Sequence, residues 1–388
     1  MRLEEERCWL EIDLEKLRRN AAIVEGLAGP GCTPIGVVKT NCYGLGAVEI
    51  ARELLACGCR ILSTADMAEA LALRRAGIRE PILLLGPAAP ESVEAAIREN
   101  IILPVVDLEN ALLLERAAAP CGRLRTHIKV DVGMNRLGIP VNGREEEARE
   151  DIRRVTALPH LTNEGLMTHI SGMQDPALDH LNVEQLERFS AFGDFLAEIG
   201  ICLPMHCESS MLFLSHPEYH QQFARLTSAY LGIEKGYEPL GARCVARLCT
   251  RVLQIKQVKK GDCIGYWMTY AAPRDMTVAV LGVGYGDGLV RGQTRGAHML
   301  IRGRRVEVVG KLSMSFSVAD ITDVPDVRLG DEVTVFGETD GGGVSIREYA
   351  ELYGGHPCEV IAMLKEHIPR VYLHPRPGAA SELPAGLG

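Results

Sequence analysis

A lysine follows directly on a short apolar segment near the start of the chain, within Pro34-Ile-Gly-Val-Val-Lys-Thr-Asn-Cys-Tyr-Gly-Leu-Gly46. The apolar residues 35–38 are typical of a buried strand, and Lys39 stands at its C-terminal end. A lysine amine in such a place can be desolvated and can act as a nucleophile that forms a Schiff base with a carbonyl compound. The alternative is a lysine that only caps the strand and keeps its ammonium group in water.

Other polar residues recur at the ends of later predicted strands. Lys129 and Arg136 end or follow the fifth strand, His169 ends the sixth, His206 belongs to the end of the seventh, and Arg225 lies in the eighth. The C-terminal ends of barrel strands meet on one face of the fold, and this face carries the active site. The pattern therefore predicts that these side chains share one site.

Three hydroxyl residues indicate a phosphate site. Ser210, Thr227 and Ser228 fall around the ends of the predicted seventh and eighth strands, where α/β barrels commonly bind phosphate. A phosphorylated cofactor close to a Schiff-base lysine suggests pyridoxal 5'-phosphate (PLP), whose aldehyde condenses with a lysine amine.

The elements that must position these residues alternate between strand and helix over about the first 235 residues. Eight short apolar strands are predicted, at 35–39, 60–64, 81–85, 101–106, 126–130, 164–169, 202–207 and 225–232. Helical patterns separate them, at 47–55, 67–76, 92–99, 108–118, 145–156 and 183–199, after a first helix at 14–27. This alternation implies parallel strands joined by right-handed crossovers, and eight units close a TIM-type (β/α)8 barrel. A doubly wound open sheet is the alternative, but no G-x-G-x-x-G motif follows the first strand.

The second part of the chain has a different pattern. Segments rich in β-branched residues, separated by Gly and Asp turn signals, predict strands at 246–258, 277–283, 298–301, 305–309, 315–321 and 332–336, with one helix at 345–352. We therefore predict an α/β chain of two domains. Residues 1–240 form a PLP-binding barrel, and residues 241–388 form a mainly β domain, with a strand at about 7–12 as a candidate to pack on it.

Composition narrows the function classes. The 388 residues carry a net charge of −9, which argues against nucleic acid or an anionic membrane as a partner. The charged N-terminus does not resemble a signal peptide, no apolar run is long enough to span a membrane, and we expect a cytoplasmic protein. The twelve cysteines are scattered without metal-ligand spacing, so no metal site is predicted.

Eight motifs, in their order and spacing, resemble the alanine racemases of the PLP-dependent barrel class. The resemblance extends from Trp9 to Tyr372, nearly the whole chain. The motifs are Trp9-Leu-Glu-Ile-Asp-Leu14, Val38-Lys-Thr-Asn-Cys-Tyr-Gly44, Lys129-Val-Asp-Val-Gly-Met-Asn-Arg136, Met167-Thr-His169, His206-Cys-Glu-Ser-Ser210, Gly265-Tyr-Trp-Met-Thr-Tyr270, Gly284-Tyr-Gly-Asp-Gly288 and Ile368-Pro-Arg370.

The resemblance implies a two-base racemisation of a small amino acid, with alanine as the expected substrate. Lys39 would hold PLP and act as the base on one face of Cα, and Tyr270 would act on the opposite face. A hydrogen-bond chain would run from Tyr270 through His169 to Arg225 and on to His206. Arg225 would face the pyridine nitrogen of PLP, and because an arginine does not readily give up a proton, it would weaken the ring as an electron sink.

The resemblance also implies the residues that bind substrate and phosphate. Arg136 and the backbone N–H of Met314 would bind the substrate carboxylate, and a carbamate on Lys129 would hold Arg136 in place. Tyr270 and Met314 come from the partner subunit in the family, so a homodimer is expected. The phosphate would be bound by Tyr43, by Ser210 and by the N–H groups of Thr227 and Ser228.

Two positions depart from the family pattern and concern the substrate. Ser315 replaces an aspartate that usually follows the methionine, and Gly354 stands where the family has a tyrosine that touches the phosphate and narrows the substrate entrance. Tyr353 lies one position earlier, so a one-residue gap would restore it. If Gly354 holds the position, the entrance is wider, and serine or a broader set of amino acids becomes an alternative to alanine.

Three further alternatives stay open. A barrel-fold PLP decarboxylase shares the architecture, but it would carry a cysteine-containing acidic motif in the C-terminal region. A single-domain PLP-homeostasis protein would not account for the second domain, and a degenerate racemase could serve as a metabolite sensor. The remaining histidines, among them His127 and His216, match no motif and are interpreted as structural or surface residues.

Overall fold

The computed structural model describes residues 5–172, 175–292, 296–339 and 342–376. The chain forms two compact units, one of residues 20–242 and one of residues 1–19 together with 243–388. Helix α1 (Leu14–Ala28) begins in the second of these and ends in the first.

The unit of residues 20–242 is the predicted (β/α)8 barrel. Its strands pair in parallel in the order β10-β2-β3-β4-β5-β6-β8-β9. The two ends of this row, β9 and β10, meet through a backbone hydrogen bond of 3.3 Å from Arg225 N–H to the Glu208 carbonyl. The strands are β2 (Thr33–Val37), β3 (Ile61–Thr64), β4 (Ile82–Leu84), β5 (Ile101–Val105), β6 (Leu124–Asp131), β8 (Leu161–Met167), β9 (Met205–His206) and β10 (Phe223–Leu226).

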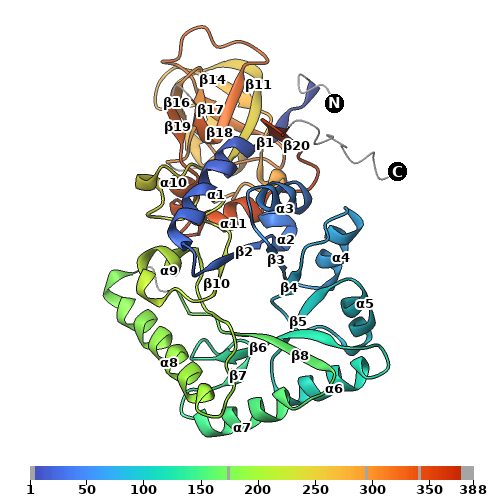
Figure 1. Cartoon of the computed structure of the whole chain (residues 1–388). Helices are drawn as coiled ribbons and strands as arrows, with labels where there is room; N and C mark the ends of the chain where they lie inside the picture. The colour runs from blue at the N-terminus through green and yellow to red at the C-terminus, as the bar shows by residue number, and fades with distance from the viewer. Residues whose placement is uncertain (1–4, 173–174, 293–295, 340–341, 377–388) are drawn as a thin grey trace. The chain divides into compact units, whose positions relative to one another are not determined.

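Helices lie on the outer side of the barrel strands, as Figure 1 shows for α4 to α8. They are α3 (Ala47–Ala56), α4 (Met67–Arg75), α5 (Val93–Arg98), α6 (Leu108–Ala118), α7 (Glu145–Thr156), α8 (Asp179–Ala197) and α9 (Ser210–Ser215). Asp66 and Asp107 cap α4 and α6 by accepting hydrogen bonds from the backbone N–H three residues later. The barrel interior is closed by apolar side chains from several strands, among them Ile35 of β2, Leu83 of β4 and Ile102 of β5.

Several barrel strands end earlier than the sequence predicts. Strand β2 ends at Val37, β9 has only Met205 and His206, and β10 ends at Leu226. Beyond β10, for example, Thr227 N–H donates to the Ser210 side chain and not to a neighbouring strand. Lys39 and the residues after Leu226 therefore lie on turns above the strand ends.

The second unit is mainly β, as predicted. Its nine-stranded sheet has the main order β16-β15-β18-β11-β1-β20, with β14, β17 and β19 paired alongside. The strands are β1 (Cys8–Asp13), β11 (Ala246–Val258), β14 (Met276–Leu281), β15 (His298–Ile301), β16 (Arg304–Glu307), β17 (Ser317–Asp320), β18 (Glu332–Thr339), β19 (Gly342–Val344) and β20 (Arg370–Leu373). A separate pair joins β12 (Cys263–Ile264) to β13 (Tyr270–Ala271), and the helices are α10 (Ile346–Glu351) and α11 (Pro357–Ala362).

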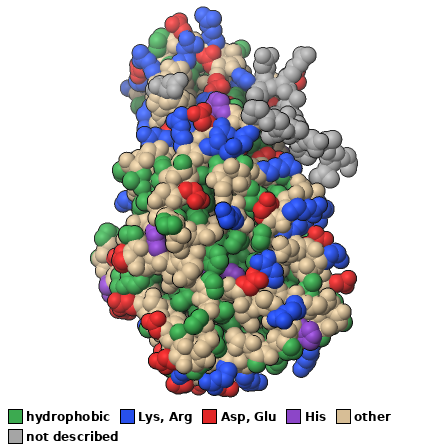
Figure 2. Space-filling view, viewed as in Figure 1, with side chains coloured by type: hydrophobic (Ala, Val, Ile, Leu, Met, Phe, Trp, Pro, Cys, Tyr) green, Lys and Arg blue, Asp and Glu red, His purple; other side chains and the backbone are tan. Residues whose placement is uncertain are grey.

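The molecular surface has charges of both signs (Figure 2), and the cysteines are not joined to one another. Lysine, arginine, aspartate and glutamate side chains are interspersed on the face shown in Figure 2. No disulfide bond joins any of the twelve cysteines, all of which lie in the described residues. Within the described ranges, no helix combines the length and the apolar character needed to cross a membrane.

Candidate active site

The turn that carries Lys39 has an unusual backbone. Helix α2 (Lys39–Tyr43) begins at the lysine, but the four residues after it, Thr40 to Tyr43, all have positive φ, between 49° and 55°. A left-handed conformation costs an L-residue about 1–2 kcal/mol, so a run of four such residues forms only where its surroundings hold it. Hydrogen bonds from Cys42 N–H to the Val38 carbonyl and from Gly44 N–H to the Thr40 carbonyl close the turn, each at 2.9 Å.

Glu69 is one of the groups that hold this turn. One oxygen of its carboxylate accepts a hydrogen bond from Thr40 N–H, and the other accepts one of 2.8 Å from Ala65 N–H, just beyond β3. Glu69 itself is fixed in the first turn of α4, where its backbone N–H donates to Asp66 at 3.0 Å. The carboxylate therefore ties the residue next to Lys39 to the end of the neighbouring strand.

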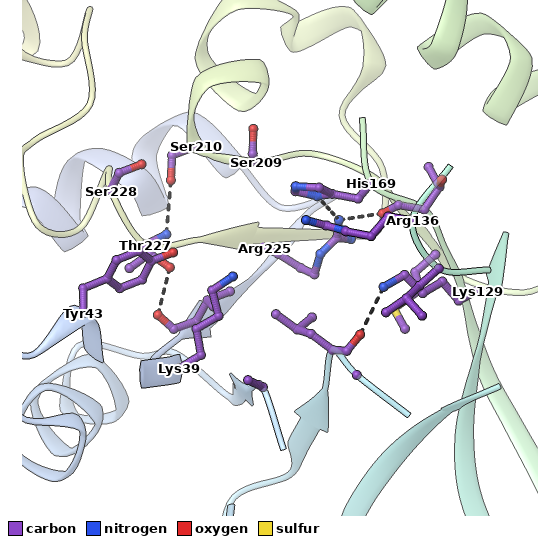
Figure 3. Close-up of a pocket in the computed structure, with 17 residues that line it drawn as sticks. Lys39, Tyr43, Lys129, Arg136, His169, Ser209, Ser210, Arg225, Thr227 and Ser228 are labelled. Carbon is purple, nitrogen blue, oxygen red and sulfur yellow. Dashed lines mark hydrogen bonds between the residues drawn. The ribbon is translucent and has the colours of Figure 1, made fainter. Parts of the chain in front are cut away.

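Lys39 lines an open cavity of about 350 Å³ at the C-terminal ends of the barrel strands. Figure 3 shows the lysine amine pointing into it. Three further cations line the same cavity, Lys129, Arg136 and Arg225, and among the residues that the structure describes no Asp or Glu does. A volume of this size suits a small ligand, and four converging cations favour one that carries negative charge.

The hydroxyl side of the cavity is built on β10 and α9. Thr227 N–H donates to the Ser210 hydroxyl oxygen at 3.1 Å, and the Thr227 hydroxyl donates to the Val37 carbonyl at 2.8 Å. The Ser228 hydroxyl donates to buried Glu234 at 2.6 Å. Tyr43 and Ser210 also line the cavity (Figure 3). The predicted phosphate-binding set, which is Tyr43, Ser210, Thr227 and Ser228, is thus brought together on one wall.

Arg225 is the most constrained side chain of the site. One terminal nitrogen donates to His206 Nδ1 at 2.7 Å and to the His206 carbonyl at 3.1 Å. The other donates to the Thr168 carbonyl at 2.6 Å and lies 3.2 Å from both the Cys207 carbonyl and His169 Nδ1. The guanidinium therefore joins the ends of β8, β9 and β10, where the barrel row closes.

The histidines around Arg225 are neutral. Burial and the nearby guanidinium lower the pKa of His169 to about 3, and the same causes lower the pKa of His206 well below its usual value. Burial lowers the pKa of Arg225 as well. The hydrogen-bond chain from His169 through Arg225 to His206, expected from the sequence, is present, with the positive charge on Arg225.

Lys129 and Arg136 occupy the opposite wall. The Lys129 amine donates to the Leu85 carbonyl at 3.0 Å, and burial together with the surrounding cations lowers its pKa to about 8. Arg136 follows a loop that is wound around the Asp131 carboxylate, which accepts from Gly133 N–H and Arg136 N–H, both at 2.8 Å. Asp131 therefore sets where Arg136 enters the cavity.

Tyr270 and Met314 belong to the β-rich unit. Tyr270 begins β13 and is half-buried, and burial raises the pKa of its phenol. Met314 lies on a loop, and its backbone carbonyl accepts a hydrogen bond of 2.7 Å from Gly286 N–H. A Cβ on Gly284 would come within 2.6 Å of that carbonyl oxygen, which explains the glycines in the Gly284–Gly288 motif.

Tyr353 and Gly354 follow the end of helix α10 and differ in backbone conformation and in exposure. Gly354 has φ +69°, in the left-handed region that ends many helices, and a Cβ there would meet no atom within 4 Å. Tyr353 is half-buried, and in the described structure its hydroxyl is buried without a hydrogen-bond partner. The glycine therefore has a backbone role of its own, and Tyr353 is the residue of the two that offers a phenol.

Two residues that the sequence interpretation left out join the site. Glu69 could have been noticed as the glutamate of a D-x-x-E pattern at a helix start, although its contact with Thr40 is not visible in the sequence. His127, interpreted as structural or surface, is buried and lies 2.9 Å from His206, from its Nδ1 to Nε2 of that residue. No sequence signal distinguishes it from other histidines.

The chain matches two family models, "Alanine racemase, N-terminal domain" over residues 12–234 and "Alanine racemase, C-terminal domain" over residues 245–372. It is 35% identical to an alanine racemase of Desulfosudis oleivorans, over 94% of this chain and 96% of that one. It is 33% identical to one of Methanococcus maripaludis, over 94% and 98%.

Solved structures agree with the sequence comparisons. Alanine racemase of Clostridium difficile superposes with a TM-score of 0.87 at 30% identity, covering 95% of this chain and 96% of that one. The Bacillus anthracis alanine racemase, solved with bound L-Ala-P, gives 0.86 at 29% identity, with 95% of both chains covered. The chain therefore belongs to the alanine racemase family, whose members are PLP-dependent amino-acid racemases.

Proposed function

We propose that this protein interconverts L-alanine and D-alanine with PLP by a two-base mechanism, with Lys39 and Tyr270 as the bases. The observation that carries the proposal is the cavity around Lys39, where a lysine amine, three further cations and a set of hydroxyl groups converge. In this proposal the barrel domain, residues 1–240, binds PLP, and the β-rich domain, residues 241–388, supplies Tyr270 and Met314.

The residues of the cavity fit PLP. Lys39 would bind it covalently, and its phosphate would be held by Tyr43, Ser210 and the N–H groups of Thr227 and Ser228. Thr227 N–H faces the Ser210 hydroxyl oxygen, so these two groups lie side by side. When bound, PLP supplies an aldehyde that bonds to an amine and a ring that takes up the electron pair left when Cα loses its proton.

The two bases act on opposite faces of Cα. Lys39 takes or returns the proton on one face, and Tyr270 returns or takes it on the other. Burial raises the pKa of Tyr270, so its phenol is a poor base at neutral pH unless a donor faces its oxygen. His169 is suited to that task, because its Nδ1 accepts from Arg225 and its proton must then be on Nε2.

Arg225 controls how far electrons are withdrawn from Cα. We expect its guanidinium to face the ring nitrogen of PLP. An arginine donates a hydrogen bond without giving up its proton, so the ring nitrogen stays unprotonated and side reactions are limited. The five acceptors around Arg225 hold it in this role.

Arg136 and the N–H of Met314 would bind the substrate carboxylate. A guanidinium binds a carboxylate with two parallel hydrogen bonds, which orients Cα as well as attracting it. A carbamate on Lys129 would place an anion beside Arg136, and the lowered pKa of Lys129, about 8, makes its neutral amine available for that reaction.

The active unit would be a homodimer in which Tyr270 and Met314 reach the cavity of the partner. The segment before Tyr270 exposes large apolar side chains, with Trp267 68% and Met268 76% exposed, and Met314 is 60% exposed. Apolar side chains gathered at this exposure are typical of an interaction surface. The free thiols of all twelve cysteines support a reducing, cytoplasmic location.

Alanine is the proposed substrate, and serine or a broader range is the alternative that Ser315 and Gly354 leave open. The left-handed backbone of Gly354 suits glycine itself, and Tyr353, one position earlier, is the candidate to narrow the entrance. In that case the preference for alanine is retained.

A panel of L-amino acids, incubated with protein and PLP and analysed by chiral chromatography, tests the function. We expect alanine to be racemised fastest, and borohydride reduction followed by peptide mapping should place PLP on Lys39. The Lys39→Ala protein is the control for both measurements. A reduced adduct on another lysine, or decarboxylation in place of racemisation, would contradict the proposal.

A further inference from the structure

A histidine one layer below the cavity touches the hydrogen-bond chain of the site. His127 lies on β6 two residues before Lys129, so both side chains are on the inner face of that strand. Its ring is buried, its Nδ1 is 2.9 Å from His206 Nε2, and it packs 6.2 Å from the Phe223 ring, centre to centre. His127 does not line the cavity.

The direction of each hydrogen bond in the chain follows from Arg225, which has only donors. His206 Nδ1, 2.7 Å from an Arg225 terminal nitrogen, must therefore be an acceptor. Since His206 is neutral, its proton is on Nε2 and is donated to His127 Nδ1. His127 is thus the acceptor at the end of the chain and carries its own proton on Nε2.

Burial keeps these rings neutral. The pKa of His127 is lowered to about 3 by burial and by Arg125 and Arg225, and the pKa of His206 is lowered well below its usual value. A neutral ring has one donor and one acceptor nitrogen, so fixing one of them fixes the other. The single positive charge of the chain stays on Arg225.

We propose that His127 is a positioning residue: by accepting the His206 Nε2–H, it holds the His206 ring in the orientation in which Nδ1 accepts from Arg225, and so holds Arg225 beside His169. If the acceptor is lost, the buried Nε2–H of His206 has no partner, and the ring gains by turning toward another one. Such a turn would lengthen the 2.7 Å contact between His206 Nδ1 and the Arg225 guanidinium. The inference deepens the proposed function, since Arg225 and His169 are the groups that act on PLP and Tyr270 there.

The neighbouring strand makes room for this ring. A Cβ on Gly165 of β8 would lie 2.7 Å from both Cε1 and Nδ1 of His127. Such distances are too short for contacts between unbonded heavy atoms, so Gly165→Ala must displace the ring. The position of the His127 ring can therefore be changed by a mutation on either strand, at His127 itself or at Gly165.

The test compares three variants by a measurement that needs neither PLP nor activity. Selective 15N labelling of histidine distinguishes, by the nitrogen shifts, acceptor nitrogens with and without a hydrogen bond, and the His206 signals are assigned with a His206→Asn protein. We expect His206 Nδ1 to show the shift of an acceptor bonded to Arg225 in the unmodified chain and in His127→Asn, whose Oδ1 can accept near the position of Nδ1. In His127→Leu we expect the Nδ1 signal to move toward the shift of an acceptor nitrogen without a hydrogen bond.

The loaded enzyme gives the second readout. Loss of one buried acceptor should lower kcat/KM of His127→Leu by roughly ten- to hundredfold, and His127→Asn should recover most of it. His216→Leu is the control, because His216 is another buried histidine of the same unit that contacts Asp179 and Glu218 instead of the chain. It should change neither the His206 Nδ1 signal nor turnover.

If His127→Leu does not fold, Gly165→Ala displaces the same acceptor and should give the same change in the Nδ1 signal. An unchanged His206 Nδ1 signal in either variant would overturn the inference, and so would equal activity of the Leu and Asn variants, which would mean that His127 only fills space. Because the signal is read in the protein without PLP, failure of the proposed racemisation would leave this result standing and distinguishable.

Discussion

Replacement of Glu69 by alanine should loosen the turn that carries Lys39. The carboxylate accepts hydrogen bonds from Thr40 N–H and Ala65 N–H, and nothing in the alanine side chain can replace it. The four residues after Lys39 would keep their left-handed backbone with one of its supports removed. We expect both a less stable barrel and a lysine amine that spends less time directed into the cavity.

The size of the effect follows from the two contacts. A hydrogen bond to a charged group contributes about 1.5–3 kcal/mol, and the partial exposure of Glu69 puts each of these toward the lower end. Two such bonds give a loss of about 3–4 kcal/mol in the free energy of unfolding. If about 1.4 kcal/mol of this is expressed as misorientation of Lys39, kcat/KM falls roughly tenfold. Glu69→Gln keeps one acceptor and should lose about half as much.

Urea unfolding followed by circular dichroism measures the stability, and the rate at which PLP attaches to the apoprotein measures the orientation of Lys39. The matched control is Glu94→Ala, since Glu94 also lies in the first turn of a barrel helix but pairs only with exposed Arg98, at 3.9 Å. Its loss should be within about 0.5 kcal/mol. The reasoning is refuted if Glu69→Ala unfolds like the control and attaches PLP at the unmodified rate.

Four further outcomes are expected. Tyr270→Phe should slow solvent-deuterium exchange at Cα of one alanine enantiomer far more than of the other, whereas equal losses would argue against two bases. Mixed dimers of Lys39→Ala and Tyr270→Phe chains should recover activity through hybrid sites, and no recovery after verified subunit exchange would place both bases in one chain. In 13C NMR spectra recorded with 13C-bicarbonate, a carbamate signal should grow as pH rises through about 8, where the Lys129 amine becomes neutral. The signal should disappear in Lys129→Gln and persist in Lys259→Gln, whose lysine is exposed and serves as the control. Tyr353→Ala should broaden the substrate range toward serine, by at most the roughly 1–3 kcal/mol that an apolar pocket can discriminate, and an unchanged range would show that Tyr353 is not at the entrance.

Much of the barrel could be predicted from local patterns. Helices 108–118 and 145–156 have the bounds that their apolar periodicity predicts, and six of the strand positions in the second unit coincide or overlap with the β-branched segments. These elements follow from periodicity and capping, which depend on residues within a few positions of one another. Strand β20 was not predicted, and β1 was predicted only as a candidate. Each of them forms through pairing with segments distant in the sequence.

The left-handed turn shows where local preference fails. Thr40, Cys42 and Tyr43 disfavour positive φ, and nothing nearby in the sequence predicts that they adopt it. The turn is held by Glu69, 29 residues further along the chain. Such a conformation is a property of the folded barrel.

The sequence by itself determined which groups meet at the site. Because parallel barrel strands present their C-terminal ends on one face, placing Lys39, Lys129, Arg225 and the hydroxyl residues at those ends brings them to one cavity whatever the details of packing. Only the tertiary structure decided how they are held and in which direction they donate. His127 and His206 are 79 residues apart in the chain, and the proton between them is placed by Arg225, which accepts nothing and is fixed by carbonyls at the ends of β8 and β9. Tautomers and strained turns depend on such distant contacts, since a single hydrogen bond across the barrel outweighs the preference of any one residue.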